Sequence, residues 1–322
     1  LLDYSVPSLF GLNVYPLEVM VEFSASNEPA RALLYALPLL LLASGVAWLC
    51  RPGLTRLVMR STISVADDTP LLRAPGWLRV LQAVGMGLMA LQVVVPLFVL
   101  LSRVRSARLA AEAILSSRTE IAHSVVIAGV SALMAVMLAY APARALVAEG
   151  RARGLLWTAT VLPLGVPASL VAIGLIVLWN RGLPLDVYGT LWMPVHASLA
   201  RFLPLAALIL AASLARLDRS LLDAAHLVEG SRLRVLGRIT LPLMLPGVLA
   251  ATALVLVLTI GELGATLLVV PPGASTLTIK IYNYMHYGAS DAVAALSLFT
   301  MLLCMALAGL GMACLLRKER AT

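Results

Sequence analysis

The ionisable side chains that lie inside long apolar runs are the residues of this sequence most able to do chemistry. Glu262 lies in TIGELGATLLVV between Gly261 and Gly264, and His196 and Arg201 lie five residues apart in WMPVHASLARFLP. An ionisable group at membrane depth is energetically costly, so such a residue predicts a functional site. The two glycines allow close helix approach or a local break. We expect all five residues to be candidates for lining a solute path.

Each of these side chains also has a structural interpretation. Glu262 could be hydrogen-bonded to a neighbouring helix, and Arg201 could pair with Glu262 or with a backbone carbonyl. If Glu262 lined the path, its carboxylate would favour a cationic or metal-bearing substrate. Alternatively, Glu262 and His196 could relay a coupling ion, which would make the protein an ion- or proton-coupled secondary transporter.

The sequence indicates no catalytic, cofactor or metal site. His123, His226 and His286 are isolated, without a second ligand at a metal-binding spacing. The chain has no GxxxxGK[ST] phosphate-binding motif, so we expect that it does not hydrolyse ATP itself. The energy for transport would then come from a separate subunit.

The elements that must position these residues are membrane helices. Hydrophobic residues make up 61% of the chain and charged residues 12%, with a mean hydropathy of +0.96, whereas soluble domains are about half apolar and a quarter charged. The sequence therefore predicts an all-α polytopic membrane protein, with seven runs long enough to span a bilayer. These runs are Ala32–Cys50, Val80–Leu101, Ile121–Val147, Gly154–Trp179, Leu191–Leu214, Gly247–Val270 and Ala292–Leu316. Pro163, Gly165 and Pro167 should kink the fourth run.

The arginines predict the orientation, because cytoplasmic loops carry an excess of Lys and Arg. The basic segments are 51–79, 142–153, 217–242 and the tail 317–322, which we place in the cytoplasm. One predicted outer loop, 102–120, disagrees, since it carries four arginines against two glutamates. We expect a short interfacial helix at 103–118. The net charge of +8 does not indicate nucleic-acid binding, because the arginines form no basic stripe with interleaved aromatics.

The most specific motif lies in 223–242, which reads DAAHLVEGSRLRVLGRITLP. Leu221, Leu222, Ala225 and Val228 recur at helical spacing and predict a short amphipathic helix. Gly230 is a candidate C-cap, and Ser231 could cap a second helix over 232–239. A stiff helix that stands out from the membrane is a shape that a partner's groove can grip.

This pattern resembles the EAA cytoplasmic loop of ABC importer permeases of the binding-protein-dependent type. In that family the loop forms a coupling helix that docks into the ATPase subunit. The resemblance implies that the coupling residues are Asp223, Ala224, Ala225, Glu229, Gly230, Ile239, Leu241 and Pro242. The chain departs from the family pattern twice: Asp223 stands in place of Glu, and Gly230 lies one position late. The stretch GELGATLL…PPG…TL also resembles the fifth-span region of ferric-iron and related permeases.

The resemblance implies a multi-pass permease of the bacterial inner membrane that is not itself an enzyme. Its expected partners are an ABC ATPase subunit dimer, a periplasmic or lipoprotein solute-binding protein, and membrane lipid. Ferric iron is the first expectation for the substrate. Thiamine, polyamine, phosphonate, sulfate and molybdate systems share this architecture.

An internal repeat predicts the domain organisation. Both ends of the chain run from an acidic residue through a Tyr- or Phe-containing segment and a small, polar, acidic turn into a final apolar run. Duplicated units are common in transporters. We expect residues 1–50 to be the C-terminal part of a first permease unit, as in fused ferric-iron and thiamine permeases, and 51–79 to be a cytoplasmic linker. Residues 80–316, with a core at 120–316, would form a complete unit, and 317–322 a cytoplasmic tail.

The motif loop generates a first prediction. Gly230→Pro, or charge reversal at Asp223, should uncouple transport from ATP hydrolysis and leave expression intact, because each change alters the helix that would transmit the push. Uptake and ATPase rates measured on the same preparation check this. Normal ATP-driven uptake in both variants would contradict a coupling role.

Overall fold

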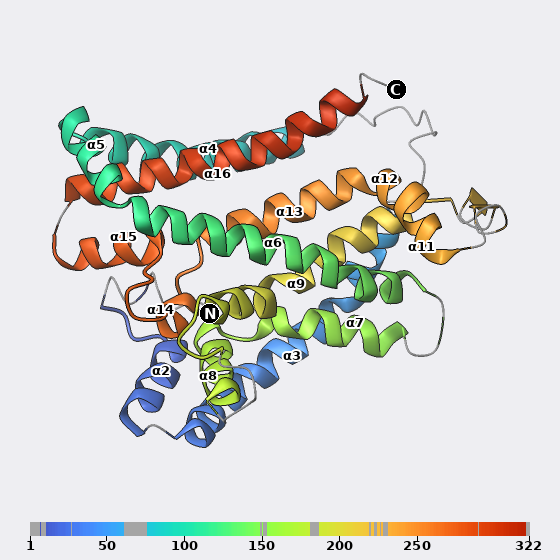
Figure 1. Ribbon diagram of the computed structural model, residues 1–322, viewed down its shortest axis with the longest axis horizontal. Helices are drawn as coiled ribbons and strands as arrows, with labels where there is room; N and C mark the ends of the chain where they lie inside the picture. The colour runs from blue at the N-terminus through green and yellow to red at the C-terminus, as the bar shows by residue number, and fades with distance from the viewer. Residues whose placement is uncertain are drawn as a thin grey trace.

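The computed structural model describes residues 7, 11–26, 28–60, 76–148, 150, 153–180, 187–218, 220–221, 224–225, 227, 231–288 and 290–319. Every regular element in these residues is a helix, and the predicted all-α membrane class is confirmed. Figure 1 shows the long helices running along one axis, with α5 (Ala107–Ser116) and α15 (Leu277–His286) at one end and α11 (Arg232–Val235) at the other. We call these the α5 end and the α11 end.

Five helices in the described part of the chain are long and apolar enough to cross a membrane. They lie in α3 (Pro29–Arg60), α4 (Gly76–Arg103), α6 (Arg118–Val147), α9 (Trp192–Ala215) and α16 (Ser290–Glu319). Two bent helix pairs raise the number of candidate spans to seven if each pair counts as one. The number of predicted spans equals this upper number, but the second pair, Arg232–Leu243 with Leu245–Ile260, begins inside the predicted loop 217–242 and does not coincide with a predicted span.

The fourth predicted span, Gly154–Trp179, is bent. It consists of α7 (Arg153–Val161), a 3-10 turn η1 (Leu162–Gly165) and α8 (Ala168–Trp179). The chain direction bends by 102° between the two halves. Pro163 and Pro167 lie at the bend, where each lacks the backbone N–H that a continuous helix would need. The predicted kink is thus confirmed, and its cause is the one that the sequence indicates.

The sixth predicted span, Gly247–Val270, is wrong at its C-terminal end. The helix α13 (Leu245–Ile260) has 16 residues and is about 24 Å long. The chain then leaves the helix at Gly261 and re-forms only one turn, α14 (Thr266–Val269). Gly261 and Gly264 are weak helix formers, and the Glu262 side chain binds the Ala265 backbone N–H at 2.7 Å, which stabilises the break.

The segment that leads into α13 is helical but irregular. The helix α11 begins after Ser231, as predicted, although the Ser231 side chain makes no capping hydrogen bond. It continues beyond the predicted end at 239 through a π-helical turn, η2 (Leu236–Thr240), and α12 (Leu241–Leu243). Pro242 cannot donate to the preceding turn, so the wide π-turn forms just before it. The chain direction bends by 74° between the segment 232–243 and α13.

Helices α6, α9 and α13 form the main core. Their facing positions are small, and Ala132, Ala135, Ala139, Ala206 and Ala211 are completely or almost completely buried. Small residues let membrane helices approach closely, which increases van der Waals contact where no hydrophobic effect acts between them. The helix α13 lies close to α9 at Gly247, where an added Cβ would stand 2.5 Å from the Ser213 Cβ.

The N-terminal helices pack against the bent fourth span. Val19 of α2 (Tyr15–Ser26) and Ala32 and Ala36 of α3 form an apolar cluster with Ile173 of α8, and the Ser169 hydroxyl donates to the Pro16 carbonyl at 3.4 Å. Both α2–α3 and α15–α16 consist of a short helix followed by a long one. The duplication itself stays a prediction.

Two boundaries near the predicted linker differ from the sequence analysis. The helix α3 continues to Arg60, ten residues beyond the expected end of the first unit at 50, and α4 begins at Gly76. Pro52 lies inside α3, since a proline in an apolar helix removes only one hydrogen bond, which neighbouring groups can compensate. A helix was also expected within 103–118, and α5 confirms it.

The Gly247 contact generates a stability prediction. Gly247→Ala should lower the stability of the folded protein by about 1–3 kcal/mol, the usual range for overpacking, because Ser213 must move. Thermal unfolding of the purified protein in detergent measures this. Gly129→Ala on α6 is the matched control, since nothing lies within 4 Å of its added Cβ. Equal unfolding temperatures for the two variants would contradict the close approach.

Candidate functional site

The break after α13 holds a buried ion pair. Arg201 on α9 donates through Nη1 to Glu262 Oε2, while Glu262 Oε1 accepts from the Ala265 backbone N–H at 2.7 Å. The Glu262 side chain is 6% exposed and the Arg201 side chain 23%. The structure therefore brings together two of the sequence candidates, 61 residues apart, and Gly261 and Gly264 flank the pair in the break. The carboxylate is the deeper partner.

Further polar contacts hold the irregular segment between α13 and α15. The Thr278 hydroxyl donates to the Ile260 carbonyl at 2.5 Å, and the Leu277 backbone N–H donates to the Ser124 hydroxyl of α6 at 2.8 Å. Lys280 pairs with Glu120 at 2.8 Å. Non-helical backbone at membrane depth is tolerated only where protein groups or water satisfy it. These contacts therefore fix the segment against α6 and the end of α13.

His196 lies apart from the ion pair. Its ring is 5.3 Å from the Trp179 ring and 6.5 Å from the Trp192 ring, measured between centroids. Its Nδ1 lies 2.8 Å from the Trp192 carbonyl, so that nitrogen carries the proton when it bonds there. Five residues on a helix place His196 and Arg201 on different faces. The structure thus gives His196 an aromatic environment and no contact with Glu262.

The motif loop forms a second site, at the α11 end. Asp218 follows α9, and its Oδ1 accepts from the Ser220 backbone N–H at 2.9 Å. This bond, assisted by the Ser220 side chain, holds the pKa of the Asp218 carboxyl below its ordinary value. Ser220, Leu221, Ala224, Ala225 and Leu227 are helical. A helix at the predicted place is therefore confirmed for these residues.

The two halves of the motif meet around one cavity of about 540 Å³. Ala224 and Ala225 line it from the loop helix, and Ile239 and Pro242 line it from η2 and α12. Leu241 lies in α12 and is exposed. Asp223, Glu229 and Gly230 lie outside the described residues, so their predicted roles stay predictions.

The sequence analysis missed the residues that fix the broken segment. Glu120 entered it only as one of the two glutamates of 102–120, and Lys280, Ser124 and Thr278 did not enter it. One signal could have found the charged pair: the two residues carry opposite charges on segments that join predicted spans. The two hydroxyls carry no signal in one sequence, because their partners are backbone groups of distant segments.

A comparison with known protein families finds a match over more than half of the chain. The profile described as "Binding-protein-dependent transport system inner membrane component" matches residues 131–320. The chain belongs to this family. The resemblance drawn from the motif loop is confirmed, and both the ion pair and the loop lie within the matched residues.

Relatives and one solved structure agree with this family. The 2-aminoethylphosphonate transport system permease protein PhnV of Salmonella typhimurium strain LT2 is 34% identical over 137 residues, which cover 42% of this chain and 51% of that protein. The corresponding PhnU of Salmonella typhi is 33% identical over 100 residues, covering 31% of this chain and 35% of that protein. This chain therefore spans about half the length of the PhnV relative.

The fold resembles a crystal structure of a bacterial ABC transporter involved in the import of the acidic polysaccharide alginate. The match has a TM-score of 0.55 at 17% identity and covers 75% of this chain and 96% of the other. At this identity the likeness shows the shared fold alone.

The ion pair predicts that its two residues differ in how much stability is lost when each one is replaced. Arg201→Gln leaves the buried Glu262 charge unpaired and should destabilise the protein by about 3–5 kcal/mol. Glu262→Gln should have a smaller effect, because the part-exposed Arg201 can still reach water or another acceptor. Unfolding midpoints of purified protein measure both effects.

The double variant with both changes separates pairing from packing. It should recover most of the stability lost in Arg201→Gln, since the buried charge is gone. Two single effects that simply add in the double variant would show that the two side chains do not interact.

Proposed function

We propose that this chain is the membrane-spanning permease of an ATP-driven importer, and that it passes a small organophosphonate anion received from a solute-binding protein. The family match over residues 131–320 is the observation that carries the transport role. The phosphonate class is supported by the names of the PhnV and PhnU relatives. These relatives give no support to ferric iron as the substrate.

The ion pair also weakens the earlier argument for a cationic substrate. A cationic substrate would need a free Glu262 carboxylate on the path, but Arg201 neutralises this carboxylate. Arg201 is the more exposed partner, and a guanidinium pairs with phosphate-like oxygens through two parallel hydrogen bonds. A phosphonate that reaches this point would compete with Glu262 for Arg201. The pair would then exchange one anionic partner for another as the solute passes.

Two buried hydroxyls lie close to the pair along the chain. Ser198 lies one turn before Arg201 on α9, and Thr259 lies one turn before Glu262 on α13. Both hydroxyls are buried, and neither makes a hydrogen bond within the described residues. Buried hydroxyls usually find a partner. They are therefore further donors that a passing anion can use.

The motif loop connects this site to the proposed ATPase. The helix α9 carries Arg201 and ends at the loop, while α13 begins just after the loop and ends at the break that holds Glu262. A push on the loop helix therefore acts on both helices that hold the ion pair. Rigid-body movement of packed helices is a sufficient mechanism, and α9 and α13 pack through Gly247 and Ser213.

The secondary-transporter hypothesis loses its main support. It needed Glu262 and His196 to relay an ion, whereas His196 packs between Trp179 and Trp192 and Glu262 binds Arg201. Within the described residues, no hydrogen bond or ion pair connects Glu262 with His196. We therefore prefer the ATP-driven importer.

Transport in vesicles tests the proposal. The permease, its ATPase and its binding protein should take up labelled 2-aminoethylphosphonate when ATP is present, and uptake should survive an uncoupler. Ferric iron in the same assay should give no ATP-dependent uptake. Uptake that needs an ion gradient and not ATP would overturn the importer, while ATP-driven uptake of iron alone would overturn the substrate class.

Variants of the ion pair test the role of Arg201. Arg201→Gln combined with Glu262→Gln should keep the protein folded yet reduce phosphonate uptake roughly tenfold or more, the loss expected for a hydrogen bond to a charged group. Glu262→Gln alone should reduce uptake less, because Arg201 stays. Equal uptake by the double variant and the unaltered chain would show that Arg201 does not contact the solute.

A further inference from the structure

The α5 end carries positive charge that the ion pairs of the structure do not neutralise. Arg103, Arg105, Arg108 and Arg118 are all exposed. Arg108 pairs with Glu112 at 3.0 Å, and the other glutamate of this region, Glu120, pairs with Lys280. Within the described residues no ion pair involves Arg103, Arg105 or Arg118. This is the region whose arginines disagree with the orientation of the other loops.

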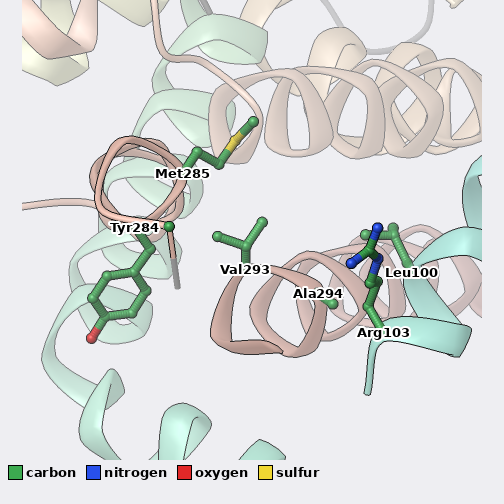
Figure 2. A pocket seen from close by; sticks show the side chains of 7 residues that line it. Leu100, Arg103, Tyr284, Met285, Val293 and Ala294 are labelled. Carbon is green, nitrogen blue, oxygen red and sulfur yellow. The ribbon is translucent and has the colours of Figure 1, made fainter. Parts of the chain in front are cut away.

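Arg103 borders a cavity of about 290 Å³ that is otherwise apolar. Figure 2 shows Leu100 and Arg103 of α4 across the cavity from Tyr284 and Met285 of α15, with Val293 and Ala294 of α16 between them. Gly288 completes the lining from the turn between α15 and α16. Its φ of 74° suits glycine, and an added Cβ would meet nothing within 4 Å, so the turn leaves this side of the cavity open.

Apolar surface surrounds the cavity mouth. The helix α4 has no buried residue along its whole length, and Phe98 and Leu101 near its end are exposed. Leu109 and Leu115 are exposed on α5. Because α4 is a membrane-length helix that ends at Arg103, this guanidinium lies where hydrocarbon meets headgroups. A basic helix with exposed leucines beside it is typical of a membrane-interface segment.

We propose that this cavity binds an anionic phospholipid, with the phosphate on Arg103 and one acyl chain entering the apolar cavity. The guanidinium supplies paired donors for phosphate oxygens, and the apolar lining rejects a bare inorganic anion. The volume is at the lower limit of small-ligand sites, which is about 300 Å³. It therefore holds part of one chain, and the remainder lies on the exposed apolar surface of α4.

A phospholipid fits these observations better than a partner protein. Leu100 of the exposed helix α4 lines the cavity, so lipid hydrocarbon that contacts α4 can also enter the cavity. The arginines at this end then have phosphate partners, which explains why they occur in a predicted outer loop. The site lies at the opposite end from the motif loop, and the proposal does not depend on the transported solute.

Lipid retention tests the proposal. The full chain is equilibrated with phosphatidylethanolamine and phosphatidylglycerol in equal amounts, extracted in mild detergent, and examined by native mass spectrometry. The unaltered chain should retain phosphatidylglycerol in preference to phosphatidylethanolamine. Arg103→Gln should reduce this preference about fivefold, the effect expected for one arginine near an anionic surface. Val293→Phe fills the cavity and should reduce the amount of either lipid retained.

Arg118→Gln is the matched control, since it removes an exposed charge at the same end that forms no ion pair within the described residues and does not line the cavity. It should change the preference less than Arg103→Gln does. Equal effects of the two variants would show diffuse surface attraction and overturn the site. No preference in the unaltered chain would overturn it as well, and so would a co-purifying acidic protein that Arg103→Gln releases. Uptake is not part of this readout, so failure here leaves the proposed importer untouched.

Discussion

The pairing of Arg201 with Glu262 is the interaction on which the rest of this structure depends. A helix that stops inside a membrane exposes backbone groups that lipid cannot satisfy. Here the Glu262 carboxylate makes two contacts. It accepts a hydrogen bond from the Ala265 N–H at the break, and it neutralises the Arg201 guanidinium of α9. A buried carboxylate without that guanidinium would carry a large desolvation cost. The break, the charge and the contact between α9 and α13 therefore form one unit.

This unit lies at one end of a helix pair whose other end holds the motif loop. The small residues of α6, α9 and α13 keep that pair closely packed, so a displacement at one end is not absorbed by loose side chains. The bent fourth span adds a second irregular element, on which α2 and α3 pack. Long helices thus supply the scaffold, and two irregular segments interrupt it.

The sequence predicted the class of fold and the bend in the fourth span, because these follow from local chemistry. Continuous apolar runs predicted the spans, and Pro163 and Pro167 predicted the bend that the structure shows. It did not predict the end of α13, since Gly261 and Gly264 permit either a continuous or a broken helix. Likewise, it left Arg201 with two alternative partners. The choice between them depends on how α9 lies against α13, and contacts across 61 residues leave no local pattern.

The most direct test of the account is a cross-link from the motif loop to an ATPase. Leu227 is 87% exposed on the loop helix, so Leu227→Cys, with Cys50, Cys304 and Cys314 replaced by serine, offers one reactive thiol there. We expect an ATP-sensitive adduct with a partner that carries a phosphate-binding GxxxxGK[ST] motif, and none from Leu109→Cys at the α5 end. No such adduct, in protein whose uptake collapses with an ion gradient, would contradict the account.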